Sequence, residues 1–152
     1  MLAARRLTAI AVAAAITVFA VAPATAPAAD AAPAIQFSYV QYNSPGSDRG
    51  GNTSLNGEYI TIKNRSTVAK SLKGWTVRDV ANHVYRFGSF TLKPGASVTL
   101  YTGKGTNTAS KRYWGQSWYI WNNDGDTAIL KNASGTRIDT CSWGSSGSAK
   151  RC

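Results

Sequence analysis

The chain has 152 residues and a formal net charge of +10 at pH 7, with 17 Lys and Arg against 7 Asp and Glu, two cysteines and one histidine. A single histidine and the absence of a CxxC motif argue against a zinc centre or a thiol redox site. The positive charge implies attraction to polyanions, and because no basic run is longer than two residues, we expect any nucleic-acid binding to be diffuse.

Residues 1–31 have the pattern of a secretory signal peptide. Arg5 and Arg6 precede the uncharged apolar stretch LTAIAVAAAITVFAVA, and alanine-rich cleavage sequences follow it. The apolar stretch is short for a membrane-spanning helix, and Pro23 ends it. We therefore predict a secreted or cell-wall-associated protein with no transmembrane segment in its mature form.

We place the cleavage after Ala31, within the range 28–34 where small residues offer several alternatives. The mature chain then has a short N-terminal segment, 32–34, and one domain, 35–152. A chain of this length is long enough to bury a hydrophobic core as a single domain.

The mature chain contains short segments in which apolar and polar residues alternate, rich in β-branched and aromatic residues. They are 34–43, 58–64, 75–80, 83–87, 97–102, 126–132 and 136–143. Sequences rich in Gly, Asn, Asp and Pro separate them, and no helical period follows the signal peptide. This spacing predicts an all-β, antiparallel β-sandwich.

The two cysteines, Cys141 and Cys152, lie near the C-terminus of a chain predicted to be exported. An even number of cysteines in an oxidising compartment indicates a disulfide. The Gly- and Ser-rich sequence between them can bend back, so we expect the bond to fix the C-terminal tail to the last strand.

The stretch WYIWNNDGDTAIL, 118–130, could be a turn between two strands or a metal-binding loop. A DG pair flanked by apolar alternation predicts a hairpin with positive φ at Gly125, in which Trp121 ends one strand. A calcium loop of the EF-hand type would need a downstream Glu, which is absent. We predict that Asp124 and Asp126 accept backbone hydrogen bonds and bind no metal.

The aromatic residues suggest both a core and a surface. Trp75 precedes Val77 on one face of a predicted strand, so we expect it to be the central core tryptophan. A denser cluster follows, and its candidate ligand residues are Tyr113, Trp114, Trp118 and Tyr119. These rings would stack on sugars, form a peptide groove, or cover one end of the sandwich.

Catalytic signatures are weak in this sequence. His83 is the only histidine and Glu58 the only glutamate, and no nucleophile elbow, phosphate loop or cofactor motif is present. Salt bridges to arginines such as Arg78 or Arg137 are the simplest expectation for Asp79 and Asp139. We predict that the protein is not an enzyme and needs no cofactor.

Three motifs follow one another in the mature chain: Gly74 and Trp75, then Pro94 and Gly95 of LKPG, then Trp121, Asn122, Asn123, Asp124, Gly125 and Asp126. In this order they resemble the motifs of the lamin-tail domain, an immunoglobulin-like module of nuclear lamins and of exported bacterial proteins, over roughly residues 35–143. The resemblance implies an immunoglobulin-like β-sandwich without shared catalytic residues. We expect a secreted, non-enzymatic module for protein or cell-surface interaction, with a wall polymer, a polysaccharide or another polyanion as the alternative ligand.

Overall fold

The computed structural model describes residues 31–152, and residues 32–152 form one compact unit. The predicted signal peptide falls outside the described residues except for Ala31, so its cleavage stays a prediction. Within the described part, no helix is long and apolar enough to cross a membrane.

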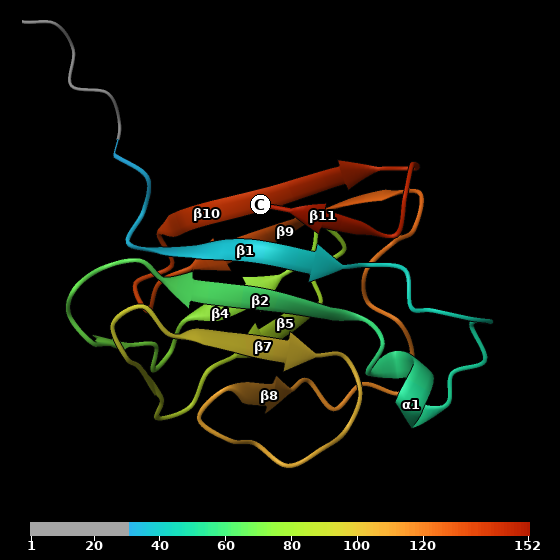
Figure 1. Ribbon diagram of the computed structural model, residues 1–152, viewed down its shortest axis with the longest axis horizontal. Helices are drawn as coiled ribbons and strands as arrows, with labels where there is room; N and C mark the ends of the chain where they lie inside the picture. Colours follow the sequence, from blue (N-terminus) through green and yellow to red (C-terminus); the bar gives the residue numbers. More distant parts are fainter. Residues whose placement is uncertain (1–30) are drawn as a thin grey trace, which may run out of the picture. The chain divides into compact units, whose positions relative to one another are not determined.

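Two β-sheets pack face to face (Figure 1). The first has the strand order β11-β1-β2-β7-β8 and consists of β1 (Ile35–Gln41), β2 (Tyr59–Asn64), β7 (Ser97–Tyr101), β8 (Lys111–Tyr113) and β11 (Ala149–Arg151). The second has the order β10-β9-β4-β5 and consists of β4 (Thr76–Arg78), β5 (Val84–Arg86), β9 (Gly125–Lys131) and β10 (Arg137–Gly144). A small pair, β3 (Lys70–Ser71) with β6 (Thr91–Leu92), and one helical turn, α1 (Asn52–Leu55), complete the described fold.

The core between the sheets follows from the alternation of side chains along each strand. Ile60 and Ile62 of β2 point inward, as do Ala128 and Leu130 of β9, and all four are fully buried. Their intervening neighbours point outward and are partly exposed. Burying one such aliphatic side chain contributes about 1.5 to 3 kcal/mol before the entropy cost of folding, so the two-residue period determines which face of each sheet becomes the core.

The prediction of an all-β sandwich is confirmed, and each of the seven predicted segments contains a strand. Two features differ from the expectation. Strand β8 pairs with β7 in a parallel arrangement, so the sandwich is not wholly antiparallel. The short strands β3, β6, β8 and β11 and the turn α1 fall in sequences predicted as connections, because two to four residues are too few to display a period.

A bulge in β1 connects the two sheets. The pairing of β1 with β2 shifts between Phe37 and Tyr39, and the Phe37 N–H donates a 2.7 Å hydrogen bond to the carboxylate of Asp139 on β10. Asp139 therefore satisfies a backbone donor of the opposite sheet and makes no salt bridge with an arginine, which corrects our expectation for this residue.

Candidate functional site

The four aromatic residues predicted as a ligand surface do not form one ring cluster: Trp118 and Tyr119 contact each other with centroids 5.5 Å apart, whereas Tyr113 and Trp114 contact other rings. Tyr113 ends β8, and its ring stacks on that of Tyr101 with centroids 5.2 Å apart. Trp114 packs against the core and meets Trp121 edge to face at 5.8 Å. Trp118 is the most exposed of the four, with 62% of its surface accessible. Whether any of these residues binds a ligand stays a prediction.

A row of four tyrosines crosses the outer face of the five-stranded sheet. Tyr39 on β1, Tyr59 on β2, Tyr101 on β7 and Tyr113 on β8 have ring centroids separated in turn by 5.9, 5.5 and 5.2 Å. Tyr59 lies directly opposite Tyr101, and Tyr101 directly opposite Tyr113. All four are partly exposed. We call these residues the tyrosine row.

The phenol group of Tyr59, in the middle of the row, stays protonated. Burial raises the pKa of Tyr59 above 10.0, and the neighbouring Tyr39 and Tyr101 raise it further. A neutral phenol keeps its ring available for stacking and its hydroxyl available as a donor and an acceptor. The row therefore offers a continuous aromatic surface with polar tips.

Hydroxyl and basic side chains surround the tyrosine row. Thr61 and Thr99 lie on neighbouring strands with their hydroxyl oxygens 3.2 Å apart. Lys111 pairs with Thr99, Arg151 with Tyr39, and Lys63 lies on the same outward side of β2. None of the five strands of this sheet contains an Asp or Glu, so the strands contribute only positive charge to this face.

Glu58 lies just before β2, and its side chain is fully buried beneath the sheet. Its carboxylate accepts hydrogen bonds from the Thr102 hydroxyl at 2.5 Å and from the backbone N–H groups of Ile120 and Trp121 at 3.1 and 2.8 Å. Burial raises the pKa of this carboxyl from 4.5 to about 7, against the opposing effect of these hydrogen bonds. Glu58 thus holds the irregular segment 114–124 against the sandwich.

Trp118 and Tyr119 contact the segment that forms an open groove beside α1, although neither of them lines it. The Trp118 ring lies against the backbone of Gly50, where a Cβ would come within 2.5 Å of the ring. The Tyr119 hydroxyl lies 2.5 Å from the Ser54 hydroxyl. The groove has a volume of about 510 Å³, and its lining includes Ser54 and Arg49. It is mostly apolar in its walls and has no buried charged group.

The segment Asn122–Asp126 is a turn that leads into β9, and it does not form the predicted hairpin. Trp121 belongs to no strand, and β9 begins at Gly125 with φ +134°. Asp126 is buried and accepts bonds from the backbone N–H groups of Asn122 and Thr127. Asp124 is exposed and accepts no hydrogen bond in the described structure. Of the two aspartates predicted to accept backbone hydrogen bonds, only Asp126 does so.

Trp75 is not the central core tryptophan. It is only partly buried and precedes β4, whose core side chain is Val77. The buried tryptophans are Trp121 and Trp143, at 3% and 9% exposure, and they pack edge to face with centroids 5.7 Å apart. The prediction for Trp75 was wrong because the residue follows the turn before β4 and is only partly buried against the core.

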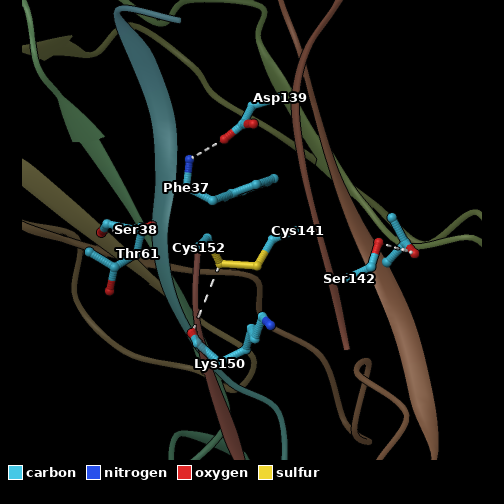
Figure 2. Close-up of a disulfide and its surroundings, with 9 residues drawn as sticks. Phe37, Ser38, Thr61, Asp139, Cys141, Ser142, Lys150 and Cys152 are labelled. Atoms are coloured by element: carbon cyan, nitrogen blue, oxygen red, sulfur yellow. Dashed lines mark hydrogen bonds between the residues drawn. A yellow bond between two sulfur atoms is a disulfide. The ribbon is translucent and has the colours of Figure 1, made fainter. Parts of the chain in front are cut away.

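The predicted disulfide between Cys141 and Cys152 is present, with an S–S distance of 2.00 Å. Its partners belong to different sheets (Figure 2), because Cys141 lies on β10 and Cys152 follows β11, which pairs with β1. The Cys152 N–H also donates to the Ser38 carbonyl at 3.2 Å. The bond therefore fixes the tail to β10, the last of the predicted strands, as expected, and it joins the two sheets because the tail itself pairs with β1.

A comparison with protein-family models matches residues 28–145 to the lamin tail domain. The chain belongs to the lamin tail domain family. The match covers more than half of the chain and agrees with the immunoglobulin-like sandwich described above, so the resemblance seen in the sequence is confirmed. A search of curated proteins returned no match. In this lamin tail domain, β11 and Cys152 lie C-terminal of the matched residues.

The histidine of this lamin tail domain serves the turn between β4 and β5. Nδ1 of His83 lies 2.6 Å from the buried carboxylate of Asp79, which also accepts the His83 N–H at 2.7 Å. Asp79 makes no salt bridge with Arg78, contrary to our expectation. Within residues 31–152, no group of three or more His, Cys, Asp and Glu side chains is placed to hold a metal ion.

Sequence reasoning missed Glu58 and most of the tyrosine row. Tyr39, Tyr59 and Tyr101 each adjoin a fully buried aliphatic residue in a predicted strand, and this neighbour marks them as outward-facing. Their alignment depends on the strand register, which the alternation does not specify. The signal available in the sequence was the recurrence of tyrosine at outward positions of separate strands.

Proposed function

We propose that this lamin tail domain is an exported, non-catalytic module that attaches to a polysaccharide of the cell surface or wall through the tyrosine row. The observation that carries the proposal is the uninterrupted contact of four aromatic rings on one outward face. The disulfide supports an oxidising compartment, and the immunoglobulin-like family supports a binding role without catalysis.

The dimensions of the row favour a chain-like ligand. Four adjacent strands lie about 4.8 Å apart, so the row extends over roughly 15 Å. A polymer lying across the strands would meet successive rings, each offering a flat apolar surface with a hydroxyl at its edge. The hydroxyls of Thr61 and Thr99 lie alongside and can bond polar groups of the same chain.

The charges near the row favour an acidic polymer over a neutral one. Lys63, Lys111 and Arg151 surround the row, and none of the strands of this sheet contributes a carboxylate. Long-range attraction would increase the association rate with an anionic chain, and the rings would supply contacts that salt does not screen.

A protein partner is the second candidate, and the exposure of Trp118 favours it. This ring is 62% exposed near the groove beside α1, and tryptophan is enriched among residues that dominate protein interfaces. The two candidates therefore use different aromatic residues, which makes them separable by mutation.

Isothermal titration with acidic and neutral polysaccharides tests the proposal. We expect Tyr59→Ala to weaken binding of the acidic polymer at least tenfold, which corresponds to about 1.4 kcal/mol, and Tyr59→Phe to retain most of it. Trp118→Ala is the matched control, because it removes an exposed ring outside the row. The melting temperature of each variant checks that the fold is intact.

Two results would contradict polysaccharide attachment through the row. One is that Trp118→Ala abolishes binding while Tyr59→Ala leaves it unchanged. The other is that single-stranded DNA binds as well as the polymer and both dissociate in high salt, which would indicate diffuse electrostatic attraction alone.

A further inference from the structure

A basic pocket opens on the outer face of the four-stranded sheet, on the opposite side of the sandwich from the tyrosine row. It has a volume of about 250 Å³ and lies where β4, β5, β9 and the loop after β9 meet. Three cationic side chains line it, from Arg78, Arg86 and Lys131. We define these three residues with Thr76 and Asn132 as the basic pocket.

The strand register brings these cations together. Thr76 on β4 is the direct partner of Arg86 on β5 and of Lys131 on β9. Arg78 lies two residues further along β4 on the same outward side, since the intervening residue points into the core. Arg137 on β10 is the direct partner of Lys131 and adds a fourth positive charge.

No acidic residue neutralises this cluster. Like charges placed opposite one another on neighbouring strands destabilise a sheet, yet the one salt bridge within residues 31–152 joins His83 to Asp79. Asp79 is fully buried in that contact, and Asp139 is bonded to a backbone N–H of β1. The cluster is therefore left with uncompensated positive charge.

The donors of the pocket are partly fixed in position. Arg86 donates to the Gly74 carbonyl at 2.9 Å, and Arg78 donates to the side-chain oxygen of Asn82. A guanidinium has five N–H donors, so both retain donors for a ligand while these bonds restrict their motion.

Asn132 adds a donor of defined orientation. Its side-chain oxygen accepts bonds from the backbone N–H groups of Ser134 and Thr136, at 3.1 and 2.9 Å. The amide nitrogen is consequently the free end of the side chain. Thr76 lies between Arg86 and Lys131 in the strand register and lines the pocket, so its hydroxyl is available as a further donor.

We propose that the basic pocket binds a phosphate group. Two guanidinium groups, one ammonium group and neutral donors match an oxyanion with several acceptor oxygens, and the arginine fork pairs with phosphate in a bidentate manner. Free phosphate and an extracellular phosphodiester polymer both present this group, and the experiment below distinguishes them. This site is independent of the tyrosine row, so the domain has two binding faces.

Titration of ¹⁵N-labelled protein with inorganic phosphate at constant ionic strength and pH 7 tests the site. We expect saturable shifts of the backbone amides of Thr76, Asn132 and Gly135. Arg86→Gln and Lys131→Gln are each expected to weaken binding at least tenfold. Lys93→Gln is the matched control, because Lys93 is exposed and lies in neither the basic pocket nor the tyrosine row, so removal of its charge should leave phosphate binding unchanged.

A second arm with poly(glycerol phosphate) distinguishes the source of the group. Tighter binding than inorganic phosphate, lost in the same two variants, assigns the site to polymer-borne phosphate, and equal binding per phosphate assigns it to the free ion. The proposal is overturned if no saturable shift occurs, if acetate at equal ionic strength produces the same shifts, or if Lys93→Gln weakens binding as much as Arg86→Gln. Tyr59→Ala should not alter binding of inorganic phosphate. The phosphate proposal and the polysaccharide proposal can therefore fail independently of each other.

Discussion

The C-terminal strand β11 and the irregular segment 114–124 are attached to the sandwich by different means. The disulfide to Cys141 and pairing with β1 hold β11, whereas the buried Glu58 carboxylate accepts two backbone bonds from the other segment. A covalent attachment is indifferent to pH and sensitive to reduction. An attachment through a buried carboxyl group depends on protonation and on the satisfaction of every donor around it.

Removal of the carboxylate should have the largest effect. Glu58→Ala leaves the Thr102 hydroxyl and the N–H groups of Ile120 and Trp121 without their acceptor, and each unsatisfied buried donor costs about 1 to 3 kcal/mol. We expect the free energy of unfolding to fall by about 4 kcal/mol or more, measured by chemical denaturation. Thr102→Val, which removes one donor only, is the control with about 1 kcal/mol expected. A loss for Glu58→Ala no greater than that of the control would contradict this role.

The pH dependence of the free energy of unfolding distinguishes the Glu58 attachment from the disulfide, because only the Glu58 carboxyl titrates. The unfolded chain releases the Glu58 proton near pH 4.5, but burial raises the pKa in the folded state to about 7. Stability is therefore favoured by this group at low pH and decreases as the pH rises from 4.5 to 7, by about 3 kcal/mol in all.

The difference in unfolding free energy between the native protein and Glu58→Gln, followed from about pH 4 to about pH 8, isolates this contribution, because other titrating groups cancel. A difference that does not vary over the interval would show that the carboxyl titrates normally.

Loss of the disulfide should have a smaller, pH-independent effect. Closing a loop with a sequence separation of 11 contributes about 2 to 3 kcal/mol in the chain-entropy description. The double variant with Cys141→Ser and Cys152→Ser should lose that amount at both ends of the pH interval. Mass spectrometry without reductant should find the native protein two hydrogens lighter than its reduced form, and two free thiols would refute the bond.

The smallest effect is expected at the end of segment 114–124. Asp124→Asn should change the free energy of unfolding by less than about 0.5 kcal/mol, because the side chain is exposed. Asp126→Asn should cost about 1 to 2 kcal/mol, because the Asp126 carboxylate accepts two backbone N–H bonds. Chemical denaturation of both variants measures the difference.

Calcium should leave the melting temperature unchanged. Bound calcium at 100 times its dissociation constant would add about 2.7 kcal/mol, so a rise that Asp124→Asn abolishes would restore the metal-loop interpretation.

The alternation of apolar and polar residues predicted the longer strands and the face of each strand that is buried. The seven longer segments each place aliphatic side chains on one face, and this alone distinguishes the core positions Ile60, Ile62, Ala128 and Leu130. Strands β8 and β11 escaped detection because each has three residues with adjacent basic side chains, and only pairing with a longer strand makes them extended.

The candidate sites required knowledge of register and distance. The donors of Glu58 lie 44 to 63 residues further along the chain, so no local motif reveals their contact. The basic pocket joins residues from β4, β5 and β9 that are scattered in the sequence. Trp75 shows that local sequence also does not decide which tryptophan is buried. Its sequence neighbours are typical of a core tryptophan, but Trp121 and Trp143 occupy the core.

The pairing of β11 with β1 also bears on solubility. Without β11, the edge strand of the five-stranded sheet would be β1, whose sequence IQFSYVQ is uncharged and rich in residues that favour strands. An exposed, uncharged edge strand of this kind is a template for pairing with a strand of another chain. The tail replaces it with a three-residue strand that carries Lys150 and Arg151. We therefore expect that the disulfide, by holding this short basic strand on β1, reduces strand-to-strand aggregation.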